Sequence, residues 1–300
     1  MVGGILLNME LWFIFAVAAA VIGGVPSFIM KVAAHRGYNP ELFIFYGSVS
    51  SVIMLIPMAV FFSGTDNLNW SMLGLAGLAG VVASGGGIFR ILALRCIDTT
   101  IYFPLAKLVS PSLAIAMGVV FFSESFSTLE WLGLISGVTV PLLLVTRKEN
   151  GRQNNLWMGL ILVLVTGVLS ALVALVHKYV SDIYGDVFWI ISAAATGVLI
   201  GSSVFIIYKQ GLFNFVAHIK TDTTKHLAGW ALLRGVVLSA AFGCGVYAFI
   251  LGGTLAIVHT IQSLYILIPI VLAIIFYKEH WNLQKVLAIV LSLGALALLG

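Results

Sequence analysis

Apolar runs of about 20 residues recur along the whole chain, and short polar stretches separate them. A hydrocarbon core about 30 Å thick needs about 20 apolar residues in one helix, so each run is long enough to cross a bilayer. The runs do not alternate apolar and polar positions, which argues against a β-barrel. We therefore predict an all-α polytopic membrane protein with about ten transmembrane helices. The expected spans cover about residues 11–33, 41–62, 70–94, 99–122, 127–146, 155–178, 186–208, 227–251, 254–277 and 282–300.

Composition supports the same class. Hydrophobic residues make up 61% of the 300 positions and charged residues only 9%, whereas a soluble domain has about 25% charged residues. This balance, with a mean hydropathy of +1.13 and a net charge of +4, excludes a soluble fold, a disordered chain and a nucleic-acid binder. Cys96 and Cys244 are too few for a disulfide framework or a multi-cysteine zinc site. We expect neither a metal site nor a cofactor.

The two halves of the chain resemble one another. Thr99 is followed 22 residues later by FFSESFS, residues 121–127, and Thr254 is followed at the same spacing by FYKEHWN, residues 276–282. Five spans fall in each half, and an odd number forces the halves to insert with opposite orientation. Inverted repeats are typical of secondary transporters. We predict two inverted five-helix repeats, at residues 1–146 and 156–300, joined by a linker at residues 147–155.

The segment Ala93–Val138 carries a recognisable motif. It has a proline pair in the fourth span, a glutamate at the end of that span, and then a tryptophan and spaced glycines, at Pro104, Pro111, Glu124, Trp131, Gly133 and Gly137. This pattern resembles the EamA-like half of the drug/metabolite transporter (DMT) superfamily. Ala248–Gly294 repeats it more loosely, with Pro269 and Glu279. The resemblance implies a transporter fold and leaves the substrate open, because the superfamily moves amino acids, drugs, sugars, nucleotide sugars and phosphorylated compounds.

Basic side chains lie inside two of the expected spans. Lys107 is about 12 Å, and Arg234 about 10 Å, along its helix from the lysine-rich side. An ionisable residue at that depth costs a few kcal/mol and usually faces a cavity. The two residues would meet in a positive chamber, while Arg90 is shallower and is expected to extend to the interface. Arg234 is open to either interpretation.

Acidic residues are absent from the middle of every expected span. A cation carrier would need a carboxylate there, so the pattern favours an anionic or zwitterionic solute such as an amino acid, organic acid or phosphorylated compound. The expected substrate-binding residues are Lys107, Arg234, Gln262, His259, Ser110, Tyr265 and Thr100. The expected gating or helix-kink positions are Pro104, Pro111 and Gly86, each of which also fits simple helix packing. Glu124 and Glu279 are expected to cap the N-terminus of the following helix.

Lys and Arg gather in the loops after the odd-numbered spans, and acids such as Asp66, Glu130 and Asp186 lie on the opposite side. The positive-inside rule then places both termini outside, whereas the resembled family usually has both inside. We expect a multi-pass protein of a prokaryotic plasma membrane, monomeric or homodimeric, with a small-molecule solute and membrane lipid as partners. The predicted function is secondary transport by alternating access, through rocking of the two halves. A lipid flippase or scramblase is the alternative, and an intramembrane enzyme a remote one, because no catalytic constellation is visible.

Overall fold

The computed structural model describes residues 2–66, 68–97, 99–143, 156–210, 222–264 and 283–299. Within these ranges the regular structure is entirely helical. The helices are α1 (Val2–His35), α2 (Pro40–Ser63), α3 (Trp70–Cys96), α4 (Thr99–Phe122), α5 (Thr128–Leu143), α6 (Leu156–Tyr184), α7 (Val187–Gln210), α9 (Asp222–Ile250), α10 (Leu255–Ser263) and α12 (Leu283–Leu299). Seven of the described helices are long and apolar enough to cross a membrane, and α5 and α12 are shorter apolar helices. The prediction of an all-α polytopic membrane protein is confirmed.

Short polar signals set the ends of several helices. The side-chain oxygen of Asn39 accepts a hydrogen bond from the backbone of Leu42, which caps α2, and Asn69 caps α3 in the same way. Before α5, Ser127 and Glu130 form a reciprocal capping box, in which each side chain accepts from the other's backbone N–H. These caps sit directly between apolar helices, so consecutive helices turn back and run in opposite directions, while most of their packing is against helices elsewhere in the chain.

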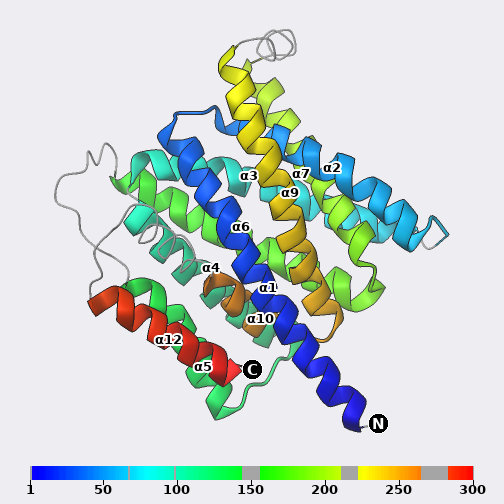
Figure 1. The fold of residues 1–300 in the computed structure, drawn as a ribbon, viewed down its shortest axis with the longest axis vertical. Helices are drawn as coiled ribbons and strands as arrows, with labels where there is room; N and C mark the ends of the chain where they lie inside the picture. The colour runs from blue at the N-terminus through cyan, green and yellow to red at the C-terminus, as the bar shows by residue number, and fades with distance from the viewer. Residues whose placement is uncertain are drawn as a thin grey trace.

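The helices pack in a pattern that is preserved when the first five are exchanged with the last five. In this exchange α1, α2, α3, α4 and α5 correspond to α6, α7, α9, α10 and α12, respectively. The contact of α1 with α9 then matches that of α6 with α3, and the contact of α3 with α7 matches that of α9 with α2. The contact of α4 with α6 likewise matches that of α10 with α1. The remaining large contacts join corresponding helices, namely α2 with α7, α4 with α10, and α5 with α12. Figure 1 shows α5 and α12 side by side at one edge of the bundle, with the long helices α1 and α9 crossing its face.

Small residues bring helix backbones into direct contact where α3 crosses α7. A Cβ atom on Gly80 would overlap the backbone carbonyl of Ala194, and one on Gly197 would overlap the carbonyl of Gly77. Glycine is required at these positions because the two backbones leave no room for a side chain.

A second crossing of this kind joins α2 to α9. A Cβ atom on Gly235 would overlap the carbonyl of Gly47, and the hydroxyl of Ser51 donates to the carbonyl of Gly235 at 3.1 Å. Ser50 donates to the carbonyl of Leu232 at 3.0 Å. This interface therefore combines close packing with interhelical hydrogen bonds.

The predicted kink positions all lie inside continuous helices. α3 runs through Gly86 and α4 runs through both Pro104 and Pro111. A Cβ atom on Gly86 would meet Leu169 at 3.7 Å, which is an ordinary contact, whereas one on the neighbouring Gly87 would overlap Ile44. The close approach that was considered for Gly86 is thus made by Gly87.

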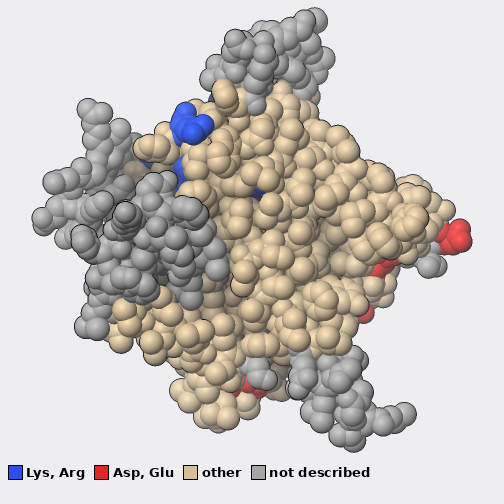
Figure 2. All heavy atoms as spheres, in the orientation of Figure 1, with Lys and Arg blue, Asp and Glu red and all other residues tan. Residues whose placement is uncertain are grey.

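Charged side chains divide between two ends of the molecule. In Figure 2, Lys and Arg lie toward the upper end, while Asp and Glu lie toward the right and lower edges. Arg36 and Arg95 flank the ends of α1 and α3, and Asp66 and Asp186 lie in the turns on the opposite side. Both chain ends lie toward the lower side in Figure 1.

Candidate functional site

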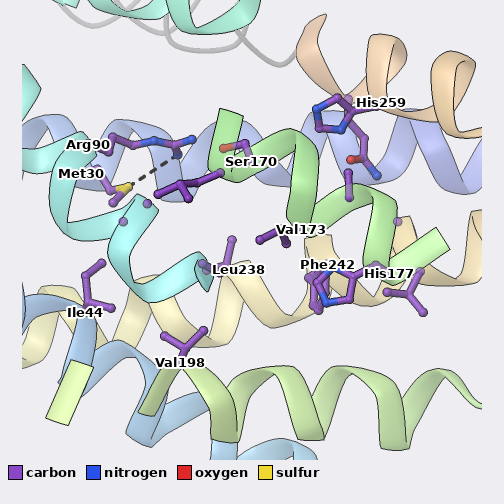
Figure 3. Close-up of a pocket in the computed structure, with 18 of the residues that line it drawn as sticks. Met30, Ile44, Arg90, Ser170, Val173, His177, Val198, Leu238, Phe242 and His259 are labelled. Atoms are coloured by element: carbon purple, nitrogen blue, oxygen red, sulfur yellow. Dashed lines mark hydrogen bonds between the residues drawn. The ribbon is translucent and has the colours of Figure 1, made fainter. Parts of the chain in front are cut away.

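A cavity of about 270 Å³ lies in the middle of the bundle, between α1, α3, α6, α9 and α10 (Figure 3). One face of α9 forms a long side of it, because its lining residues recur at three- and four-residue steps. They are Arg234, Leu238, Phe242, Gly245, Val246 and Phe249. A second compartment of about 210 Å³, toward α2 and α7, shares Arg234, His177 and Phe242 with the first, so the two adjoin.

Two arginines give the cavity its positive charge. Arg234 is only 8% exposed, lines both compartments, and holds its guanidinium carbon 6.0 Å from the ring centre of Phe43. Arg90 lines the first compartment, where its Nε donates to the Tyr102 hydroxyl at 3.2 Å and its Nη1 donates to Met30 Sδ at 3.8 Å (Figure 3). Arg90 therefore faces the cavity, where the sequence favoured an extension to the interface.

No acid is present among the described residues that line either compartment. The described lining of both compartments is therefore apolar or neutral apart from its arginines, and a guanidinium in a low-dielectric interior attracts an anion strongly. The arrangement can therefore hold a carboxylate or phosphate, for which the planar guanidinium offers paired donors.

The polar patch on α10 reaches the cavity as His259 and Gln262. The hydroxyl of Ser110 on α4 lies 2.7 Å from His259 Nε2. The amide of Gln262 lies against Gly245 of α9, where a Cβ atom would overlap it. Ser110 thus sits behind the lining and orients the imidazole, and this pair joins α4 to α10.

Lys107 is 9% exposed and lies one turn before Ser110 on α4. It is close enough to His259 for its charge to act on the ring, yet it is not among the cavity-lining residues. The expected meeting of Lys107 and Arg234 in one chamber is therefore not what the structure shows, since Arg90 takes that place beside Arg234. Tyr265, Glu279, and the side chain of Thr100 lie outside the described part of the chain.

Glu124 sits at a helix N-terminus, although not that of the following helix α5. Its carboxylate accepts hydrogen bonds from the backbone N–H groups of Leu255 and Ala256, the first two residues of α10. The hydroxyl of Thr254 accepts from the third N–H, so the first turn of α10 is fully capped. The fold gives Glu124 this role because α5 already has its own capping box, and because α4 and α10 pack together.

His177 is a cavity residue that was absent from the expected binding set. It is 3% exposed, lines both compartments, and packs its ring edge-on against Phe242 with ring centres 4.6 Å apart. The signal for it was the small polar face of α6, on which Ser170, Ala174 and His177 follow at steps of four and three. The adjacent Lys178 obscured that signal because it resembles an interfacial residue, and it indeed pairs with Asp182 at 2.6 Å.

Comparisons with known proteins agree with this architecture. A protein of known crystal structure is 14% identical to the chain, and the match covers 94% of this chain and 96% of the other, with a TM-score of 0.67. The two therefore share a fold. No curated protein matches the sequence. The sequence model of the EamA-like transporter family matches residues 10–146. These residues carry the sequence pattern of the EamA-like transporter family of the drug/metabolite transporter superfamily, and with the seven long apolar helices they support a multi-pass membrane protein of the transporter type.

Proposed function

We propose that this chain is a secondary transporter that moves a small anionic or zwitterionic solute by alternating access. The observation that carries the proposal is the central cavity, which Arg90 and Arg234 line and in which no described lining residue is acidic. A carboxylate or phosphate gains charge-assisted hydrogen bonds from a guanidinium.

The size of the cavity limits the solute. A volume of about 270 Å³ is just below the roughly 300–1,000 Å³ of pockets that bind drug-sized molecules. An amino acid, a short organic acid or a small phosphorylated metabolite fits this space, whereas a whole lipid does not.

The packing of the bundle supports the two-repeat architecture that alternating access uses. Most large contacts between the described helices have a counterpart when the first five helices are exchanged with the last five, the contact of α4 with α5 being an exception. Repeats at residues 1–146 and 156–300 account for this pattern, and the cavity lies where they meet, as in other transporters built from inverted repeats.

The distribution of charge supports one orientation. The end of the bundle that carries Arg36 and Arg95 faces the cytoplasm under the positive-inside rule. Both chain ends lie toward the opposite, acidic side, so we place both termini outside a prokaryotic plasma membrane. Reaction of a single cysteine, introduced at Asp66, with a membrane-impermeant thiol reagent tests this orientation in a cysteine-free background. Labelling of intact cells is expected, and labelling only after lysis would reverse the orientation.

Ligand-induced thermal stabilisation of the purified protein tests the substrate class. Anionic, zwitterionic and cationic metabolites are screened on wild type, Arg234→Ala, Arg234→Lys and Lys107→Ala. A ligand at 100 times its dissociation constant stabilises the folded state by about 2.7 kcal/mol. Lys31→Ala is the matched control, because Lys31 carries the same charge but is exposed and lies outside the cavity.

A carboxylate or phosphate is expected to stabilise wild type and Lys31→Ala, and to lose that effect in Arg234→Ala. Arg234→Lys should retain part of it, since charge is kept but the paired donors are lost. Lys107→Ala should weaken binding less than Arg234→Ala, because Lys107 is not in the lining. Stabilisation by cationic or neutral solutes alone, equal in all variants, would refute the proposal.

A further inference from the structure

The imidazole of His177 is the feature of the cavity that helix packing does not explain. His177 lies between the two compartments, 3% exposed. Its Nε2 atom is buried, and it has no hydrogen-bond partner among the residues that the structure describes. Leaving a buried polar atom unpaired is costly, and such atoms in native proteins call for a specific explanation.

The serine hydroxyls of the compartment toward α2 are already engaged with helix backbones. In the compartment toward α2, the hydroxyls of Ser48, Ser51 and Ser239 donate to the carbonyls of Phe45, Gly47 and Gly235, respectively. In the other compartment, His259 bonds to Ser110. The remaining neighbours of His177 along α9, such as Leu238 and Phe242, are apolar. The fold therefore brings no hydrogen-bond partner from the described residues to Nε2 of the imidazole.

The charged groups nearest in sequence also point elsewhere. Lys178 forms an ion pair with Asp182 and lies over the rings of Phe122 and Phe249, about 6 Å from each ring centre. The α6 backbone thus directs Lys178 away and turns His177 inward. A group that occupies the cavity is the natural partner for Nε2.

We propose that His177 Nε2 hydrogen-bonds a second polar group of the transported anion, while Arg234 binds its acidic group. This inference rests on the proposed function and narrows it. The substrate is then a short anion with a hydroxyl, an amino group or a second carboxylate at the end remote from the first acid. Imidazole suits all three, since its nitrogen can donate or accept according to the tautomer.

The geometry of α9 sets the separation of the two groups. Arg234 and Phe242 are eight residues apart on this helix, which is about 12 Å along the axis, and His177 packs on Phe242. Figure 3 shows Arg90 at one end of the cavity and His177 near the other. The arginine side chain spans part of this distance. The rest must be spanned by the substrate, so several of its atoms must separate its second polar group from its acidic group. A group on the carbon next to the acid would not reach His177.

Matched pairs of ligands test the inference. Each pair differs only by a terminal hydroxyl: butyrate with 4-hydroxybutyrate, hexanoate with 6-hydroxyhexanoate, and propyl phosphate with 3-hydroxypropyl phosphate. Dissociation constants are measured by titration calorimetry or thermal shift on the purified full chain. The variants are His177→Leu, which removes the hydrogen bond, and His177→Gln, which retains a polar amide. His226→Leu is the control, because His226 is exposed at the start of α9.

Wild type and His226→Leu are expected to bind the hydroxylated member of at least one pair about tenfold more tightly, the scale of one hydrogen bond. His177→Leu should bind both members of that pair equally. His177→Gln should restore part of the preference. His177→Leu without ligand should unfold at or above the wild-type temperature, since it removes an unpartnered polar atom.

Two results would overturn the inference. A preference that persists in His177→Leu would place the second polar contact elsewhere. Equal binding of both members of every pair by wild type, with binding still lost in Arg234→Ala, would leave the proposed function intact and refute the role of His177. If none of these anions bound and only cations or neutral solutes did, the proposed function itself would fail.

Discussion

Glycine at position 118 leaves the space that the carboxylate of Glu124 occupies, so Gly118→Ala is a sharp test of the link between α4 and α10. A Cβ atom there would overlap Glu124 Oε2. The carboxylate has no free direction in which to move, because it accepts from the N–H groups of both Leu255 and Ala256. The substitution must therefore break this cap or shift α4 from α10.

The expected loss follows from the number of hydrogen bonds. A hydrogen bond to a charged group contributes about 1.5–3 kcal/mol, and two are at stake. Alanine returns about 0.5–1 kcal/mol, because it favours a helix more than glycine does. The net destabilisation is about 2–5 kcal/mol. At roughly 2–4 °C for each kcal/mol in a large domain, the unfolding temperature should fall by about 4–20 °C.

Thermal unfolding of the detergent-purified protein measures this effect, and Gly74→Ala is the matched control. Gly74 lies in the helix α3, and a Cβ atom there would meet nothing within 4 Å. The control should be as stable as wild type or slightly more so. If Gly118→Ala were as stable as Gly74→Ala, Glu124 would not be holding α10, and the account of this cap would be wrong.

Three further predictions concern the same end of α4 and the helix crossings. Ser123 has a left-handed backbone with φ of 52°, so Ser123→Gly should stabilise the protein by about 0.5–1 kcal/mol, seen as a higher unfolding temperature; a lower one would count against strain at this turn. Burial raises the pKa of Glu124 above its ordinary 4.5, despite its two N–H donors. The raised pKa therefore stabilises the folded state fully below pH 4.5, and this stabilisation declines as the pH rises through the folded-state pKa. Glu124→Gln removes the titrating group, so the unfolding temperature of this variant should depend less on pH above 4.5. An unchanged slope would contradict this prediction. Gly197→Ala should lower the unfolding temperature, because its Cβ atom would overlap the carbonyl of Gly77. Gly229→Ala is the control and should not lower it, because a Cβ atom there meets nothing within 4 Å. Equal stability of the two variants would mean that α3 and α7 separate at little cost.

Hydropathy predicted most of the fold because the bilayer imposes a length on every span. The expected spans at 41–62 and 70–94 correspond to α2 (Pro40–Ser63) and α3 (Trp70–Cys96), with ends set by Asn39 and Asn69. Periodicity does not reveal which helices touch. The partner of Glu124 is an example, because the sequence suggests the adjacent helix, whereas tertiary packing brings α10 to it.

The candidate site was predictable only in part, since depth in a span does not determine the direction of a side chain. Arg234, His259 and Gln262 line the cavity, whereas Lys107, at a depth similar to that of Arg234, lies behind the lining. Arg90 and His177 illustrate the reverse case. Arg90 lies near the end of α3, where sequence alone favours an interfacial role, and His177 was absent from the expected binding set, yet both face the cavity.

The two glycine crossings connect the sequence halves rather than separating them. α3 is joined to α7, and α2 to α9, by backbone contacts in which Gly80, Gly197 and Gly235 leave no clearance. A slide of one residue, about 1.5 Å, would drive side chains into the opposing carbonyls. The crossings therefore hold these four helices together across both halves of the chain. Under the proposed transport, a motion that separated the two sequence halves as rigid bodies would have to break both crossings, so we expect these four helices to move together.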